Sequence, residues 1–377
     1  MKISLALLVV LLNMSAFRGS KVLVSLFALE LGAAQIMLGV IVAFYSLCPM
    51  LMALYAGKLV DRIGVMRPVI LGSMGIALSL TLPGLMPHLP VLYLSAILIG
   101  ASHVFYNVAV QNLVGQIGDP SDRTRNFSNL SLCIASGGFL GPIIAGFVID
   151  HIGHSTGYLL LAILPGLSAA LLFRSRAGLA ALRGSQAKKE KEAVYSAGLL
   201  RNPPLRRVLI TSGIILTAID LFQFYMPIYG HQIGLSATAI GFVLASFAGA
   251  SFLVRVVMPR IVARLGDERV MLISIFMAAL TYLLFPWVEQ GMLLAITAFL
   301  LGLGTGCGQP LTLMMIYERA PSDRTGEAIG LRMALNNLTH IVVPLFFGAL
   351  GSAFGIAPVF LANSAMLATG GFLIRRR

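Results

Sequence analysis

Long apolar runs separated by short polar segments make up almost the whole chain. Most of the runs reach the roughly 20 residues that an α-helix needs to cross a hydrocarbon core about 30 Å thick. Irregular backbone cannot face lipid, so we expect these runs to be helices. The alternating pattern of an outer-membrane barrel is absent. The pattern predicts an all-α membrane protein with twelve transmembrane helices, at residues 4–29, 35–57, 68–87, 90–116, 127–150, 156–173, 207–230, 236–258, 269–288, 291–317, 328–352 and 356–373.

Composition supports a membrane protein. Apolar residues make up 58% of the chain and charged residues 11%, whereas a soluble domain has roughly 45–50% and about 25%. Of the 27 Lys and Arg residues, four lie in the interior of the predicted spans, and the others all lie in the terminal segments, in the loops of one side or at the span ends that adjoin those loops. Basic loops stay cytoplasmic. The net charge of +13 is therefore a topology signal rather than a nucleic-acid surface, and predicts a multi-pass protein of the cell (inner) membrane with both termini cytoplasmic.

The second half of the chain repeats the first. The segment GKLVDRIGVMRPV at residues 57–69 returns as PRIVARLGDERV at 259–270, with Gly64 on Gly266 at an offset of 202. PSDRT occurs at 120–124 and again at 321–325. This predicts two pseudo-symmetric six-helix bundles, comprising residues 1–174 and 207–377, joined by a polar cytoplasmic linker at 175–206.

Charged residues occur at mid-membrane depth in both halves. Arg18 lies about 17 Å from one end of its span and about 21 Å from the other, and Asp220 is similarly deep, at 1.5 Å of rise per residue. Such charges usually line a water-filled cavity or pair with another group. Arg18 and Asp220 are equivalent under the 202-residue offset, as are Lys21 and Gln223. We expect Arg18 and Asp220 to face one another over a central cavity, although a purely structural ion pair is the alternative.

Further polar residues fall on single helical faces. His103, Asn107 and Gln111 are spaced i, i+4 and i+8, and so are Arg332, Asn336 and His340; such residues share one face. Gln309 aligns with Asn107. Aromatic surface near Asp220 includes Phe224. These faces are expected to line the cavity, with hydrogen bonding between helices as the alternative.

Glycines mark close packing and sharp turns. Gly57 is expected to permit close packing and Gly64 a tight reversal. The fifth span contains GGFLGPIIAG, with Gly141 and Pro142, which favours backbone-to-backbone packing and a bend. GLGTGCGQP, at residues 302–310, lies inside an apolar run and indicates helix packing or a flexing gate rather than a phosphate loop.

Metal and enzyme chemistry are not indicated. The three cysteines lie in three different spans, which supports neither a disulfide framework nor a metal site. Asp150, His151 and His154 are read as solvated loop residues. No metalloprotease motif is present, and no Ser, His and Asp set stands out, so we expect no enzyme, no cofactor and no metal.

Twelve spans, a basic central loop and a parallel repeat resemble the major facilitator superfamily over essentially the whole chain. GKLVDRIG followed by Arg67 closely resembles that family's signature between its second and third helices. GGFLGPIIAG resembles the fifth-helix motif of its proton-coupled exporters, with Ala145 in place of one glycine. Ala96 stands where many drug exporters of the family carry an arginine, so the chain departs from them there.

The resemblance implies two bundles that rock about a mid-membrane site, with Asp61, Arg62 and the 120–125 loop latching the cytoplasmic side. The gating residues that follow from the motifs are Gly57, Asp61, Arg62, Gly64, Arg67, Gly141 and Pro142.

Residue chemistry and resemblance together predict a secondary active transporter of a small amphipathic organic solute, anionic or zwitterionic, with proton-coupled export favoured. We expect a monomer in the lipid bilayer, with protons as the coupling ion. Proton carriers would be Asp220, His103 or His340. Alternatives are proton-coupled uptake of an organic anion, a lipid flippase or scramblase, and a receptor that transports nothing. The predicted substrate-binding residues are Arg18, Lys21, His103, Asn107, Gln111, Asp220, Gln223, Phe224, Gln309, Arg332 and Asn336.

Overall fold

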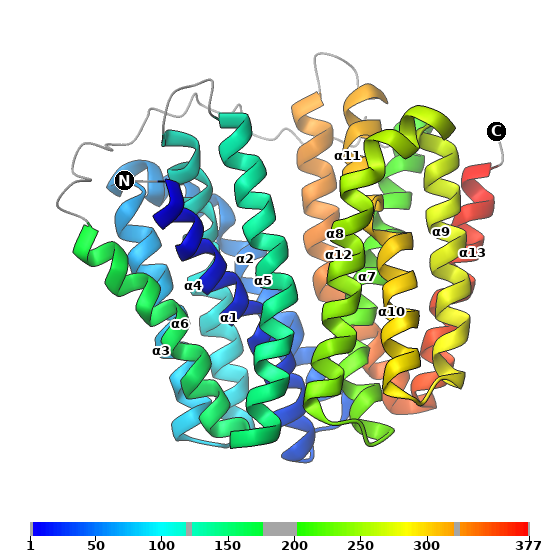
Figure 1. Ribbon diagram of the computed structural model, residues 1–377. Helices are drawn as coiled ribbons and strands as arrows, with labels where there is room; N and C mark the ends of the chain where they lie inside the picture. Colours follow the sequence, from blue (N-terminus) through cyan, green and yellow to red (C-terminus); the bar gives the residue numbers. More distant parts are fainter. Residues whose placement is uncertain (1–2, 118–122, 176–201, 320–324, 376–377) are drawn as a thin grey trace. The chain divides into compact units, whose positions relative to one another are not determined.

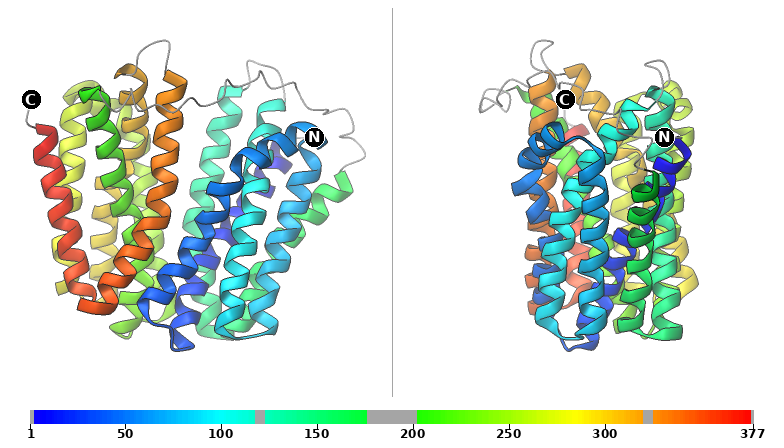
Figure 2. Two further views of the ribbon diagram at one scale, coloured as in Figure 1. Left: turned by 180° about the vertical axis from the view of Figure 1, so that it is seen from behind. Right: turned by 90° about the vertical axis from the view of Figure 1, so that its left-hand side faces the viewer.

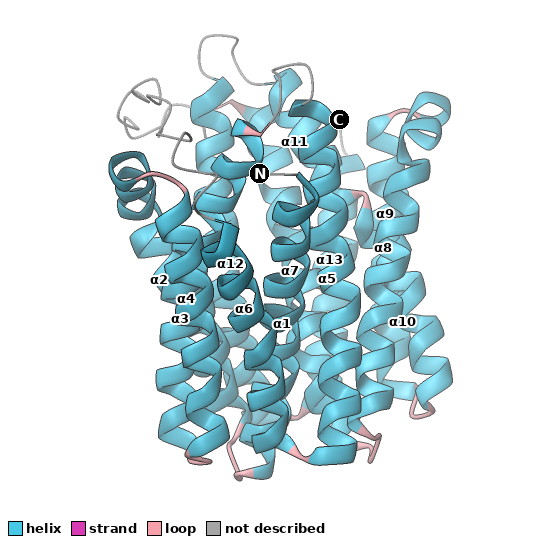
Figure 3. Cartoon of the chain, turned by 60° about the vertical axis from the view of Figure 1, so that its left-hand side comes forward, coloured by secondary structure: helices cyan, strands magenta, loops and turns pink. Residues whose placement is uncertain are grey.

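A computed structural model of the chain describes residues 3–117, 123–175, 202–319 and 325–375. Every regular element within these ranges is a helix (Figure 3). Eleven apolar stretches in the described ranges are long enough to cross a membrane, and Ile356–Phe372 is a shorter apolar helix. The predicted all-helical membrane fold is confirmed.

Contacts divide the chain into two compact units. Unit 1 comprises Met1–Ala33, Val40–Lys189 and Ser236–Ala245, and unit 2 comprises Ala34–Gly39, Glu190–Leu235 and Ser246–Arg377. The domain boundaries predicted at residues 174 and 206 stay a prediction, and most of the predicted linker lies outside the described residues. The helices of the first half are α1 Ile3–Glu30, α2 Gln35–Ile63, α3 Met66–Leu85, α4 Leu89–Gln116, α5 Arg123–Ile152 and α6 His154–Ser175. Those of the second half are α7 Pro203–Gln232, α8 Ala237–Leu265, α9 Asp267–Leu284, the short 3-10 turn η4 Phe285–Trp287, α10 Gly291–Gly306, α11 Gly308–Arg319, α12 Thr325–Phe354 and α13 Ile356–Arg375.

Helix α1 is the central helix of unit 1. It packs against α4, α5 and α6, while α3 lies beside α4 and α6 (Figures 1 and 2). The amide nitrogen of one polar residue within it finds partners inside the unit: Nδ2 of the fully buried Asn13 donates to Oγ of Ser168 at 2.7 Å and to the carbonyl oxygen of Val9 at 2.9 Å. Buried polar groups in a membrane protein need such partners.

The predicted close packing of the fifth span is confirmed on α1. A Cβ atom added to Gly141 would lie 2.6 Å from the carbonyl oxygen of Ser15, and one added to Gly19 would lie 2.9 Å from the carbonyl oxygen of Gly141. A Cβ on Gly137 would lie 2.5 Å from that of Met14. The backbones of α1 and α5 approach so closely because these positions carry no side chain.

In unit 2, helix α7 holds its neighbours through tyrosine hydroxyls. Tyr225 donates to the carbonyl oxygen of Phe347 at 2.5 Å, Tyr229 donates to that of Val288 at 3.1 Å, and Tyr282 of α9 donates to that of Ala218 on α7. A buried phenol needs a partner for its hydroxyl. These bonds fix the rotation of α7, which carries Asp220.

The structure repeats with the same offset as the sequence. The turn glycines Gly64 and Gly266 have φ of 82° and 81°, a region that favours glycine. This confirms the tight reversal predicted at Gly64.

Two further pairs of contacts obey the offset. In unit 2, Gly39 of α2 lies against the backbone of Pro344, and in unit 1, Gly241 of α8 lies against the backbone of Pro142. In unit 1 the Asp150 carboxylate accepts hydrogen bonds from the first N–H groups of α8, at Ala237 and Thr238, at 2.9 and 2.7 Å. In unit 2, Oγ of Ser352, the counterpart of Asp150, accepts from the N–H of Ile36 at 3.0 Å.

Four sequence-based expectations need correction. Helix α2 continues to Ile63, so the charged hinge begins inside a helix. A Cβ on Gly57 would meet no described atom within 4 Å, so the close packing expected there is wrong. The predicted span at 291–317 is interrupted at Cys307, between α10 and α11. Asp150 caps a helix rather than being a solvated loop residue, because it lies in the last turn of α5 and accepts from the first N–H groups of α8.

The α1–α5 contact predicts opposite effects for two neighbouring glycines. Gly137→Ala should lower stability by about 1–3 kcal/mol, as over-packing usually does, because its Cβ would also lie 3.0 Å from the Ser15 nitrogen. Gly138→Ala is the matched control, since a Cβ there would meet nothing within 4 Å, and it should melt at or slightly above the wild-type temperature. Thermal unfolding of the detergent-purified variants measures both. Equal melting temperatures for the two would contradict the packing described here.

Candidate functional site

Lys21 of unit 1 lies beside two aromatic rings. The Nζ atom of Lys21 lies 5.4 Å from the ring centre of Phe17 and 5.8 Å from that of Tyr45. Both distances are within the range of a cation–π attraction. Tyr45 of α2 also donates from its hydroxyl to Oγ of Ser20 at 3.2 Å. Lys21 and Arg18 both belong to α1, and both are half-buried.

His103 completes this cationic–aromatic cluster from α4. Its ring stacks on Phe17 with centroids 3.8 Å apart and planes 12° apart. Its Nδ1 atom is buried, with no hydrogen-bond partner among the described residues. We call Phe17, Arg18, Lys21, Tyr45 and His103 the cationic–aromatic cluster. It offers positive charge beside flat apolar surfaces, which suits an amphipathic organic anion.

The remaining polar residues of the α4 face lie further along that helix. Asn107 is half-buried, and its Oδ1 accepts from Nε2 of Gln111 at 3.2 Å. Gln111 is exposed. Tyr106 points the other way, since it is buried and donates to the carbonyl oxygen of Val9 at 3.3 Å. Only Asn107 and Gln111 continue the polar face as predicted.

Unit 2 contains an acid–imidazole pair. Oδ2 of Asp220 on α7 lies 2.6 Å from Nδ1 of His340 on α12. The side chains are 14% and 37% exposed, respectively, so the pair is partly enclosed yet still open on one side. Such a pair can hold or release a proton while it remains hydrogen-bonded. Sequence reasoning singled out both residues as proton carriers but did not predict that they would pair.

Arg332 makes four hydrogen bonds inside unit 2. Its Nε donates to Oγ of Ser212 on α7 at 3.2 Å. Its Nη2 donates to the carbonyl oxygen and the Oε1 of Gln309 at 3.0 and 2.5 Å, and to Oγ1 of Thr312 at 3.4 Å. Arg332 is 8% exposed and joins α12 to α7 and α11. Substrate contact by Arg332 stays a prediction, and the bonds show a structural use.

Three predicted substrate residues lie near these groups on α7 and α12. Asn336 donates to Oε1 of Gln309 at 3.5 Å. Gln223 is half-buried, one turn from Asp220. Phe224 is buried with its ring edge-on to Tyr225. Asn336 and Gln309 thus join the hydrogen-bond network of Arg332, whereas Phe224 packs in the interior of unit 2.

Among the predicted gating residues, Gly64 forms the α2–α3 turn and Arg62 and Arg67 flank it as exposed side chains. Gly141 and Pro142 lie within α5. Much of the 120–125 loop lies outside the described residues, as does the side chain of Asp61. The latch on that side stays a prediction.

Residue spacing could have revealed some of the partners that sequence reasoning missed. Ser212 lies at i−8 from Asp220, and Thr312 at i+3 from Gln309, so each shares a helical face with a residue that was identified. Phe17 and Tyr45 carried no such signal, because aromatic residues in apolar spans are common.

Comparison with known proteins places this geometry in context. The family model described as Major Facilitator Superfamily matches residues 5–288 and 209–377. The chain is 29% identical to the class C tetracycline resistance protein of Escherichia coli, over 84% of this chain and 80% of that protein. It is 24% identical to the multi-drug resistance efflux pump PmrA of Streptococcus pneumoniae, over 83% of this chain and 78% of the pump.

Solved structures share the fold. The crystal structure of the nucleoside transporter NupG matches with a TM-score of 0.80 at 14% identity, covering 100% of this chain and 98% of that one. The peptide transporter POT in complex with sulfate matches with a TM-score of 0.81 at 15% identity, covering 99% and 93%. At these identities the likeness concerns the fold alone.

Arg332 should matter for stability whether or not substrate touches it. Arg332→Met should lower the stability of the protein by about 1.5–3 kcal/mol, the range for hydrogen bonds to charged groups, because Gln309 and Ser212 lose their donor. The stability of Arg332→Lys should lie between those of the wild type and Arg332→Met, because an ammonium group cannot make the paired hydrogen bonds of a guanidinium group. Thermal unfolding measures both, with the exposed Arg207→Met as the control. An Arg332→Met protein that melts like the wild type would rule out this structural role.

Proposed function

This chain belongs to the major facilitator superfamily of transporters, and on that premise we propose that it carries a small anionic or zwitterionic amphipathic solute by alternating access, exporting it in exchange for protons. The observation that supports the substrate class is the cationic–aromatic cluster. Lys21 lies over two rings, and Arg18 sits one turn away on α1. A binding site that combines a few polar groups with aromatic walls fits an organic acid with an apolar body.

The depth of these charges argues against a purely structural role for the cluster. A cation in the middle of a membrane-spanning helix costs about 2.5–3.5 kcal/mol on insertion scales. Two cations on one helix within a single turn also repel one another. A carboxylate bound between Arg18 and Lys21 would reduce both costs, which supports substrate binding at this cluster.

Asp220 and His340 support proton coupling. Their side chains lie 2.6 Å apart and both remain partly exposed. We propose that this pair carries the exchanged proton. His103 is the weaker candidate, because its ring is held between Phe17 and Tyr106. The predicted meeting of Arg18 with Asp220 stays a prediction.

Export as the direction rests on the relatives. The tetracycline resistance protein and the efflux pump PmrA are named for resistance or efflux, and α5 carries the glycine–proline motif that resembles the one in exporters. We further propose that the protein lies in the cell membrane with both termini cytoplasmic, because the basic residues gather in loops of one side.

Removal of the Arg18 charge tests the substrate class. Arg18→Ala should lower pH-gradient-driven transport of organic anions in proteoliposomes at least tenfold, since a charge-assisted hydrogen bond contributes about 1.5–3 kcal/mol. The exposed Arg206→Ala is the control and should transport normally. The assay follows internal pH with a dye while organic anions and organic cations are added separately. Responses to cations alone would overturn the proposed class, and movement of labelled lipid instead would favour a flippase.

Neutralisation of Asp220 tests the coupling site. Asp220→Asn keeps the shape and a hydrogen bond to His340 but cannot exchange a proton at neutral pH. It should retain substrate-for-substrate exchange while losing accumulation driven by a pH gradient. The exposed Glu289→Gln in the same unit is the control and should keep both activities. Full gradient-driven accumulation by Asp220→Asn would move the proton site elsewhere.

A further inference from the structure

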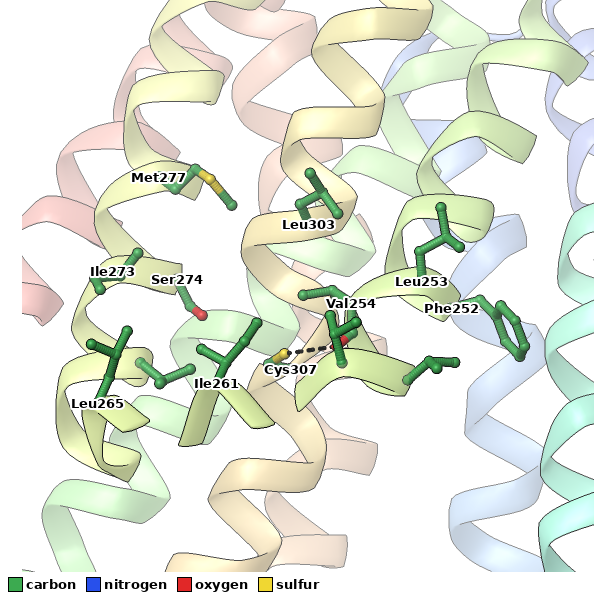
Figure 4. Close-up of a pocket in the computed structure, with 13 residues that line it drawn as sticks. Phe252, Leu253, Val254, Ile261, Leu265, Ile273, Ser274, Met277, Leu303 and Cys307 are labelled. Carbon is green, nitrogen blue, oxygen red and sulfur yellow. Dashed lines mark hydrogen bonds between the residues drawn. The ribbon is translucent and has the colours of Figure 1, made fainter. Parts of the chain in front are cut away.

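An apolar groove lies on unit 2 between α8, α9 and α10 (Figure 4). Its volume is about 620 Å³. Its lining residues are Phe252, Leu253, Val254, Val256, Val257, Ile261, Leu265, Val270, Ile273, Ser274, Met277, Leu303 and Cys307.

The groove lacks the polar groups of a solute site. Ser274 supplies its one side-chain hydroxyl, and the thiol of Cys307 is occupied, since it donates to the Val254 carbonyl oxygen at 3.8 Å (Figure 4). Sites for small solutes carry a few convergent polar groups that fix orientation. This groove has none, and its walls include large exposed apolar side chains such as Val256 and Ile273, at 58% and 53%. A long hydrocarbon chain suits it better than a polar solute.

The length of the groove matches one leaflet of a bilayer. On α8 the lining runs from Phe252 to Leu265, which is about 20 Å at 1.5 Å per residue. Half of a hydrocarbon core is about 15 Å deep. The groove also reaches the end of α8, because Leu265 is the last residue of that helix, next to the Gly266 turn. It can therefore accommodate one acyl chain along its whole depth.

Three arginines lie on α8 and α9, three or four positions from residues that line the groove. Arg260 and Arg264 on α8 follow the lining residues Val257 and Ile261 by three positions, and Arg269 on α9 precedes Ile273 by four, so each shares a helical face with the lining. All three side chains are exposed. The described part of the chain supplies no ion pair or hydrogen-bond partner for any of them.

The acidic groups at this turn are already engaged. Nη2 of Arg319 lies 2.9 Å from Oε1 of Glu268 and 3.8 Å from Oδ2 of Asp267. The fourth nearby arginine, Arg255, donates from Nε to the carbonyl oxygen of Gly306 at 2.9 Å, at the break between α10 and α11. The positive charges of Arg260, Arg264 and Arg269 are therefore available to bind an anionic group from outside the chain.

We propose that this groove binds one anionic phospholipid, with an acyl chain along α8 and α9 and its phosphate headgroup at Arg260, Arg264 and Arg269. The apolar lining, its position at the end of α8 and the three basic residues all fit this occupant. The proposed lipid site is independent of the transported solute. A lipid held here would cover exposed apolar side chains between α8 and α9. The leaflet is the one that the charge distribution predicts to be cytoplasmic, where anionic lipids attract basic segments.

Native mass spectrometry of the detergent-purified protein tests the proposal. The protein should retain one dioleoyl phosphatidylglycerol and bind dioleoyl phosphatidylcholine, which has the same acyl chains, at least tenfold more weakly. Arg264→Gln combined with Arg269→Gln should weaken phosphatidylglycerol binding about 30-fold, given about 1 kcal/mol for each basic residue near an anionic lipid. The matched control combines Arg206→Gln with Arg207→Gln at the exposed start of α7, and should bind as the wild type does.

Placement in the groove needs its own variant. Val257→Trp fills the lining and should weaken binding of phosphatidylglycerol, whereas Leu280→Trp, exposed on α9 but outside the lining, should not. Equal retention of both lipids by the wild type, equal losses in the two double arginine variants, or unchanged binding by Val257→Trp would each overturn the proposal. Should the glutamine variant fail to fold, the headgroup comparison on the wild type still decides the charge requirement.

Discussion

A charged side chain inside a membrane-spanning helix has to be neutralised by the protein or by trapped water, and this constraint shapes the polar chemistry of the chain. The carboxyl group of Asp220 meets the ring of His340. The guanidinium group of Arg332 donates four hydrogen bonds to α7 and α11. Lys21 lies over aromatic rings, which is a weaker kind of compensation than a carboxylate. A guanidinium group that already donates four hydrogen bonds gains little from a further partner.

The two halves of the chain share backbone contacts between helices but differ in their charged side chains. Backbone contacts that hold helices together keep the 202-residue offset, as the glycine–proline contacts of Gly39 and Gly241 show. Side chains at mid-depth do not keep it, since Arg18 corresponds to Asp220. Packing positions tolerate only small residues, because any added atom meets backbone. Positions facing water or ligand are free to differ, which allows two copies of one bundle to take different roles.

Sequence reasoning reached the helices and turns but not the pairing of side chains. Apolar length predicted the spans, and the turn at Gly64 followed from glycine's access to positive φ. Helical spacing gave each polar residue a face and a depth. It did not give the rotation of one helix against another, which decides that His340 meets Asp220 across 120 residues of chain. The helix break at Cys307 was also missed, because an apolar run has the same composition whether it forms one helix or two. Arg255 donates to the carbonyl oxygen of Gly306, next to that break.

The two charged hinges differ at one position that decides whether their basic residues have an acidic neighbour. The first hinge carries Asp61 between Lys58 and Arg62, whereas the second carries Ala263 at the equivalent position. With no acid at that position, Arg260 and Arg264 lack a neighbour of opposite charge on their own helix. The acids of the second hinge occur later, at the start of α9, where a helix N-terminus favours them and Arg319 pairs with them. The arginines at the end of α8 are therefore left to a phosphate from the bilayer, and the apolar groove beside them supplies the surface that the rest of such a lipid requires.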